Sequence, residues 1–378
     1  MFSRLWVVRF GLPVFLCAVA VLLSATSSAL AQKGKLTLRV IDESTGALLP
    51  ARVHLKNSRG KPVLPRGTVR WKNHFVIDGE NTLELSTGRY TFEVEHGPEY
   101  RLQTGNFQIV PKADDIQTLE MVRFVDMKRE GWWSGELHIH RPPEDVDLLI
   151  RAEDLHVAPI ITWWNRKNLW TNKQPPNPLL TKLSQDRWVH WMAGEDERGG
   201  GAVLFFNLKK PLEITTAERQ FPCAVPFIRE ARKTPGVHID IEKPFWWDVP
   251  LWLSTGMVDS IGLAHNHLWR DGMLDNEAWG KPRDKQRYPS PLGNAHWTQE
   301  IYYHVLNCGL KIPPSAGSAS GVIPNPVGYN RVYVHCGEEL SYDKWFENLR
   351  AGKVVVTNGP MLRPLVNGKL PGHSFTAR

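Results

Sequence analysis

The feature that most constrains the fold of this chain is a change in hydrophobic pattern near residue 130. Before it, from Lys35 to about Val125, short segments alternate apolar and polar residues, as in Leu36-Thr37-Leu38-Arg39-Val40. Turn-forming residues separate these segments, as in Asp42-Glu43-Ser44-Thr45-Gly46. Repeated short strands with this alternation are typical of a β-sandwich. We therefore predict a small all-β sandwich of the carboxypeptidase-regulatory or prealbumin kind over residues 33–125.

Beyond residue 130, apolar strands alternate with amphipathic stretches. The predicted strands are 157–162, 202–206, 237–241 and 258–264, and the predicted helical stretches are 145–155, 221–233, 251–255 and 297–306. This alternation favours an α/β domain built on a parallel, barrel-like sheet. We predict that domain over residues 130–345, followed by a C-terminal β segment over 346–378 that is cut short.

The first 31 residues have the pattern of a signal peptide. Arg4 and Arg9 precede an apolar stretch, and the small residues before Ala31 suit a cleavage site. A membrane anchor is the alternative, but the apolar run is short of the roughly 20 residues of a span and Pro13 interrupts it. We predict export to the periplasm or the extracellular space, with no stable membrane insertion after cleavage.

The charge distribution argues against a nucleic-acid partner. The net charge is +7, and loss of Arg4 and Arg9 with the signal segment leaves +5. The basic residues are scattered, whereas a nucleic-acid-binding surface needs them clustered on one face. Three cysteines remain, at positions 223, 308 and 336, and we expect mostly buried thiols with at most one disulfide. The predicted partner is a small molecule or saccharide, and the pattern does not define an oligomeric state.

Gly135-Glu136-Leu137-His138-Ile139-His140 is the sharpest local signal for chemistry. Residues two apart on a strand share a face, so His138 and His140 would point the same way. Two imidazoles at this spacing can bind one metal ion, and the Glu136 carboxylate could hold a ring nitrogen from the second shell. A pair of surface histidines is the alternative.

Other predicted strand ends also carry metal-ligating side chains. Glu195 follows one apolar run, Glu242 another, and His265 and His267 a third. In a barrel, the strand ends at one rim meet around a common pocket. We therefore predict metal ligands at His138, His140, Glu195 and His267, with Glu242 or His265 as the catalytic proton shuttle.

The order of these motifs resembles that of the PHP-type (polymerase and histidinol phosphatase-like) metallohydrolases. The Gly135–His140 motif, the strand ending Ile160-Ile161-Thr162 with Asn165, and Gly194-Glu195 carry the likeness. Segments 306–314, 317–318 and 349–360 resemble the secreted, carbaryl-hydrolase-like (CehA/McbA) branch of that family. The resemblance covers residues 130–370. It implies a distorted (β/α)7 barrel, a cluster of divalent metals and hydrolysis by metal-activated water.

Several ligand positions of that family are replaced in this chain. Trp163 and Trp164 stand where the family has Asp-His, and Gly201-Ala202 stands where it has Gly-His. The family's Gly-Ser-Asp-x-His is Gly317-Ser318-Ala319-Ser320-Gly321 here, and its Ala-His-Pro has become Ile241-Glu242-Lys243. The surviving ligands predict one Zn²⁺ or Mn²⁺ ion rather than three.

Two functions follow from this pattern. The first is a metal-dependent hydrolase acting on an ester, phosphoester or glycan-related substrate. The second is an inactive barrel that binds carbohydrate through its tryptophans. Of 16 tryptophans, 13 lie between Trp132 and Trp297, and flat rings suit the C–H faces of sugars. The predicted substrate-binding residues are Trp163, Trp164, Asn165, Trp246 and Trp247; core packing is the alternative for each tryptophan.

Overall fold

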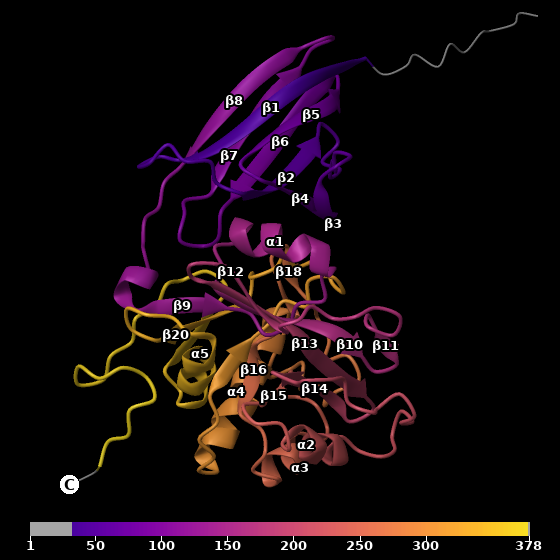
Figure 1. The fold of residues 1–378 in the computed structure, drawn as a ribbon, viewed down its shortest axis with the longest axis vertical. Helices are drawn as coiled ribbons and strands as arrows, with labels where there is room; N and C mark the ends of the chain where they lie inside the picture. The colour runs from indigo at the N-terminus through magenta and orange to yellow at the C-terminus, as the bar shows by residue number, and fades with distance from the viewer. Residues whose placement is uncertain (1–31, 377–378) are drawn as a thin grey trace, which may run out of the picture.

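The computed structural model describes residues 32–376, which form a β-sandwich and a larger β-rich unit (Figure 1). The predicted signal peptide lies outside these residues. None of the helices described has the length and apolarity that a bilayer crossing requires. The three cysteines of this part of the chain are all free, and only Cys336 is buried.

The sandwich contains two sheets. One has the order β5-β1-β8 and the other β3-β4-β2-β6-β7. Their strands are β1 (Lys33–Asp42), β2 (Ala51–Asn57), β3 (Val69–Trp71), β4 (His74–Ile77), β5 (Glu80–Ser86), β6 (Gly88–Glu95), β7 (Gln103–Ile109) and β8 (Asp114–Met121). Buried and more exposed residues alternate along β1, so its apolar side chains form one wall of the core between the sheets.

A third, larger sheet is the centre of the larger unit, with the order β19-β16-β15-β14-β13-β10-β9-β20-β21. Short β11 (Lys167–Asn168) and β12 (Leu180–Ser184) pair with β10 and β13. The other strands are β9 (Trp132–Gly135), β10 (Val157–Trp164), β13 (Arg187–Arg198), β14 (Gly201–Phe206), β15 (His238–Ile241), β16 (Ser260–Ala264), β19 (Pro314–Ala316), β20 (Arg331–His335) and β21 (Val354–Thr357). Separately, β17 (Leu268–Trp269) and β18 (Gly272–Met273) form a hairpin.

The segments that follow β9 and β19 bring this sheet close to closure. The Leu137 N–H donates to the Ala316 carbonyl at 3.1 Å, and the His140 N–H donates to the Ser320 carbonyl at 2.8 Å. Ile139 bridges both Ile160 and Ser320. The chain between Gly135 and His140 is therefore held on both sides, although it is not part of a regular strand.

The predicted (β/α)7 or TIM-like barrel is wrong. Twenty-one strands and five α-helices are described within residues 32–376: α1 (Val146–Ala152), α2 (Val225–Ala231), α3 (Val249–Ser254), α4 (Leu292–Asn307) and α5 (Tyr342–Arg350). β14 runs antiparallel to both of its neighbours, β13 and β15. Only Gly199 and Gly200 separate β13 from β14, and a two-residue turn joins antiparallel strands, whereas a parallel pair needs a crossover. The predicted boundary at residue 346 falls inside α5.

Buried ion pairs fasten the sandwich to the larger unit. Arg52 of β2 is 2% exposed, and its guanidinium contacts Glu95 and Glu153, each at 2.6 Å. Arg270 also donates to Glu95, at 3.0 Å through its Nε.

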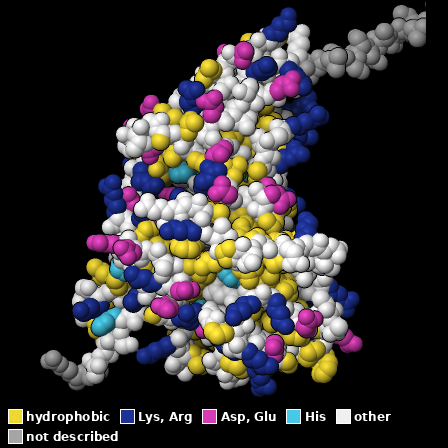
Figure 2. Space-filling model, in the orientation of Figure 1, with side chains coloured by type: hydrophobic (Ala, Val, Ile, Leu, Met, Phe, Trp, Pro, Cys, Tyr) yellow, Lys and Arg dark blue, Asp and Glu magenta, His cyan; other side chains and the backbone are white. Residues whose placement is uncertain are grey.

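Figure 1 shows α1 lying between the two units. On the face drawn in Figure 2, basic and acidic side chains are interspersed.

Candidate metal centre

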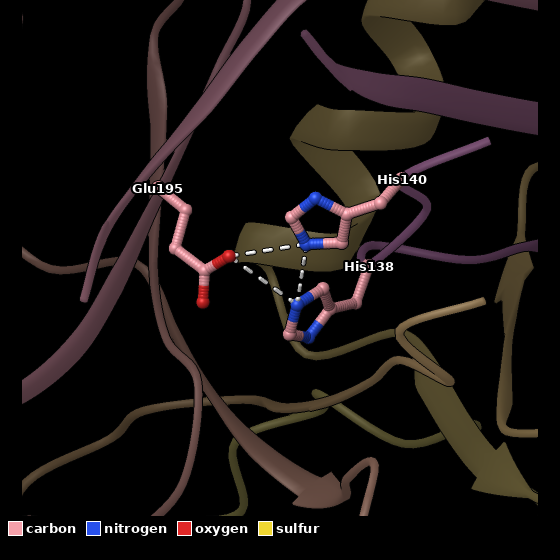
Figure 3. Close-up of side chains that lie close together, drawn as sticks. All are labelled: His138, His140 and Glu195. Atoms are coloured by element: carbon pink, nitrogen blue, oxygen red, sulfur yellow. Dashed lines mark hydrogen bonds and ion pairs between the residues drawn. The ribbon is translucent and has the colours of Figure 1, made fainter. Parts of the chain in front are cut away.

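Three side chains from two segments converge in the interior of the larger sheet. His138 and His140 lie on the extended segment after β9, and Glu195 lies on β13. Their ligand atoms all lie within 4.8 Å of one another. The two Nε2 atoms are 3.1 Å apart, and Glu195 Oε2 lies 3.1 Å from His140 Nε2 and 3.6 Å from His138 Nε2 (Figure 3).

The local backbone explains why the two histidines face the same way. Leu137 and Ile139 are buried in the core, so the alternation of an extended chain directs His138 and His140 to the opposite side. Gly317 lies directly behind His138, because a Cβ on Gly317 would be 2.3 Å from the Cβ of His138. A glycine at this position therefore permits the close approach of the segment after β19.

Charge and burial leave Glu195 suited to bind a cation. Its Oε2 is buried and has no hydrogen-bond donor of adequate geometry. Burial by itself would raise the pKa of Glu195, but the adjacent imidazoles of His138 and His140 hold it well below its usual range. Burial lowers the pKa of His140, which favours the neutral imidazole that ligates metals. Two imidazole nitrogens and one carboxylate oxygen form a donor set that fits Zn²⁺ or Mn²⁺.

Glu242 lies on the outer side of His138. Its Oε1 is 3.6 Å from His138 Nδ1, the ring nitrogen that faces away from His140 and Glu195. Its Oε2 forms an ion pair with Lys243 and accepts from Trp246 Nε1 at 3.0 Å. A carboxylate at the outer nitrogen of a ligating histidine typically fixes the orientation of the ring. The structure therefore gives Glu242 the contact that the sequence had suggested for Glu136.

Glu136 instead holds a neighbouring segment. Its carboxylate accepts from the backbone N–H groups of Ser318, at 2.5 Å, and Gly328. Burial raises the pKa of Glu136 to about 7, and these two hydrogen bonds oppose the shift. The contacts tie the chain after β19 to the segment that carries the histidines.

His265 and His267 are not members of the group around Glu195. His265 Nε2 lies 2.9 Å from Thr298 Oγ1, and His267 Nδ1 lies 2.9 Å from the Asn276 carbonyl. Burial lowers the pKa of both rings, that of His267 to about 3. The two rings pack against each other and against Phe245, so they form a separate cluster of neutral histidines.

The tryptophans predicted to bind substrate divide into buried and accessible rings. Trp163 and Trp246 are each 2% exposed, and each lies against a glycine, Gly194 and Gly201 respectively. A Cβ on Gly194 would be 1.7 Å from Trp163 Cε2, so the Trp163 ring occupies the space beside the β13 backbone. Both rings are part of the core.

Trp164 and Trp247 have accessible surface. Trp164 is half-buried, with its ring centroid 5.1 Å from that of His140. Trp247 is 54% exposed, and its Nε1 donates to the Trp279 carbonyl at 2.9 Å. The Asn165 side chain is fixed in place, because its amide forms two hydrogen bonds with the backbone of Glu197.

Sequence reasoning missed Lys243 and Glu197. Lys243 is 2% exposed. The sequence signal for its role was its position directly after Glu242, at the end of a buried strand. Glu197 lies two residues beyond Glu195 on β13, where burial and the Glu195 charge raise its pKa to about 8. Its spacing from Glu195 was the available signal, since residues two apart on a strand share a face.

Comparison with known proteins yields only partial and weak likenesses. No protein-family model and no curated protein matches the chain. Among solved structures, the TIE protein of Bacillus anthracis has a TM-score of 0.21 at 22% identity, covering 29% of this chain and 19% of that one. The minor pilin GBS52 of Streptococcus agalactiae has a TM-score of 0.22 at 18% identity, covering 25% and 46%. Phospholipase PlaB of Legionella pneumophila has a TM-score of 0.19 at 19% identity, covering 26% of each chain. This chain thus spans less than half the length of each, and TM-scores this low do not indicate a shared fold.

Proposed function

We propose that this protein is a metal-dependent hydrolase that holds one divalent ion, Zn²⁺ or Mn²⁺, between His138, His140 and Glu195. The observation that carries the proposal is the convergence of these three ligand atoms within 4.8 Å at a buried carboxylate oxygen whose close neighbours are the two imidazole nitrogens. An ion bound there would lower the pKa of a water molecule toward neutrality and so supply a nucleophile.

The surrounding residues have separable roles in this proposal. His138 and His140 present their Nε2 atoms to the centre, and Glu242 holds His138 from its Nδ1 side. The Lys243 ammonium neutralises the outer oxygen of Glu242, which leaves the inner oxygen to face the ring. Glu195 supplies the negative charge of the site, and its burial limits competition from bulk water.

The test is metal binding by the purified full-length chain. After removal of metal with a chelator, the protein is titrated with Zn²⁺ and with Mn²⁺, and bound metal is measured by mass spectrometry. We expect about one ion per chain, and an affinity at least about tenfold lower for His140→Ala. His296→Ala, which removes an exposed histidine of α4, is the control and should bind as the wild type does. Hydrolysis of 4-nitrophenyl esters and phosphodiesters is then compared with and without metal.

Two results would contradict the proposal. One is a correctly folded wild-type chain that binds neither ion, and the other is a folded His140→Ala variant that binds metal as tightly as the wild type. Circular dichroism and thermal unfolding establish folding in both cases.

Saccharide binding without catalysis is a second candidate function, and one observation favours it. The exposed Trp247 ring, tethered through its Nε1, lines a cavity of about 520 Å³ together with Trp246 and Leu253. Quenching of tryptophan fluorescence by soluble oligosaccharides in the metal-free chain, and its loss in Trp247→Ala, would support this function. Absence of quenching would exclude it for the oligosaccharides tested.

A further inference from the structure

A row of three residues across neighbouring strands connects the metal centre to the surface. Glu195 of β13 lies in register with Trp164 of β10, and Trp164 lies in register with Lys167 of β11. Neighbouring strands are about 4.8 Å apart, which places the Lys167 backbone roughly 10 Å from that of Glu195. The Trp164 ring lies between the two ends, since its centroid is 5.1 Å from the His140 ring and 5.0 Å from Lys167 Nζ.

The outer end of this row opens into a cavity of about 460 Å³. This volume is within the usual range for a small-molecule site. Trp164, Ile214 and Ala217 supply apolar surface, while Glu197 is the single acidic residue of the lining. Four basic residues also line the cavity: Arg166, Lys167, Arg198 and Arg219.

Three of these four cations have no carboxylate partner. Arg198 is paired with Asp196, with its Nη2 2.8 Å from the carboxylate. No salt bridge within residues 32–376 involves Arg166, Lys167 or Arg219. Lys167 lies over the Trp164 ring, and Arg219 lies 5.2 Å from the centroid of the Trp279 ring. An excess of unpaired positive charge beside an apolar wall favours a ligand that combines an anion with a flat apolar body.

We propose that this cavity binds the anionic end of the substrate, a carboxylate, sulfate or phosphate carried on a flat apolar body, through Arg166, Lys167 and Arg219. The inference rests on the proposed hydrolase function, because it assigns the anion to the outer end of the row and the scissile bond to the His138–His140–Glu195 end. The anion is therefore a recognition group and not the group that reacts.

The experiment measures binding in the metal-free chain, so that its result does not depend on the metal centre. Calorimetric titration at low ionic strength compares naphthalene-2-sulfonate with its neutral isostere, methyl 2-naphthyl sulfone. The variant is the double substitution Arg166→Glu and Lys167→Glu. The control is Lys209→Glu with Lys210→Glu, which makes the same change in net charge at two exposed positions outside the cavity.

We expect the wild type and the control to bind the sulfonate at least about tenfold more tightly than the sulfone. The Arg166/Lys167 variant should lose this preference while its affinity for the sulfone stays unchanged. Equal affinity of the wild type for the two probes, or a preference that survives in the variant, would overturn the inference. Metal titration of the same preparations tests the proposed function separately: a chain that prefers the sulfonate but binds no ion refutes the hydrolase and leaves the anion site standing.

Discussion

The buried pair of Glu242 and Lys243 allows a quantitative test of the site's electrostatics. Glu242 is 3% exposed and Lys243 is 2% exposed, and Lys243 Nζ lies 4.7 Å from the centroid of the Trp246 ring. Lys243→Met keeps most of the side-chain volume but removes the charge. The Glu242 carboxylate then keeps the hydrogen bond from Trp246 Nε1 and the contact with His138 Nδ1 at 3.6 Å, but it loses the Lys243 cation. Removing one partner of a buried pair costs about 3–5 kcal/mol, because the other charge stays buried without compensation.

Urea unfolding followed by tryptophan fluorescence measures this loss. The double variant Glu242→Gln with Lys243→Met removes both charges and should recover at least about 2 kcal/mol of the loss. Lys281→Met is the matched control, since Lys281 is exposed and lies over the Trp297 ring; it should change stability by less than about 0.5 kcal/mol. The reasoning is refuted if Lys243→Met costs less than about 1 kcal/mol, or if the double variant is no more stable than the single one.

Three other substitutions test separate parts of the structure. Gly194→Ala should destabilise the protein by about 1–3 kcal/mol in thermal or urea unfolding, because the added Cβ meets the Trp163 ring. Gly359→Ala is the control and should be nearly neutral, because no atom lies within 4 Å of its added Cβ. Glu242→Gln should weaken Zn²⁺ binding about 10- to 100-fold in competition titrations by loosening His138, and an unchanged affinity would remove Glu242 from that role. Burial raises the pKa of Glu95, but the Arg52 and Arg270 charges outweigh it and lower the pKa from 4.5 to about 2. The stabilisation by Glu95 is therefore complete above pH 4.5 and is lost as the pH falls toward 2. Glu95→Gln should lower the melting temperature at pH 7, and near pH 2 the variant and the wild type should melt at the same temperature. A difference in melting temperature that does not change with pH would contradict this.

Local patterns predicted the strands and the approach of His138, His140 and Glu195 better than they predicted the fold. The predicted strand segments at 157–162, 202–206, 237–241 and 258–264 all lie in the large sheet, because apolar runs of this length must be buried. The strand direction was wrong for β14, since the consequence of the Gly199-Gly200 turn was overlooked. Each of the four predicted helical stretches coincides with a helix, α1 to α4. These helices do not build a regular (β/α)7 barrel, because a two-residue turn and not a helix joins β13 to β14.

The two H-x-H motifs look equivalent in the sequence and differ in the structure. His138 and His140 face Glu195, whereas His265 and His267 are held by Thr298 and a backbone carbonyl. Nothing in a short motif records which strands will be neighbours, so the ligand set could not be completed from spacing alone. For the same reason, the outer carboxylate was assigned to Glu136 rather than to Glu242, which lies far from His138 in sequence.

The amino-acid sequence by itself determined where the apolar strands lie and which side of an extended segment His138 and His140 share. Both follow from the period of two along a strand, which is a local property of the chain. Only the tertiary structure decided that Glu195 lies beside these histidines and that Glu242, paired with Lys243, contacts the outer nitrogen of His138. It also decided that Trp164 lies between His140 and a cavity lined by basic residues. Those relations depend on the register between strands, which is set by turns and by packing over the whole sheet.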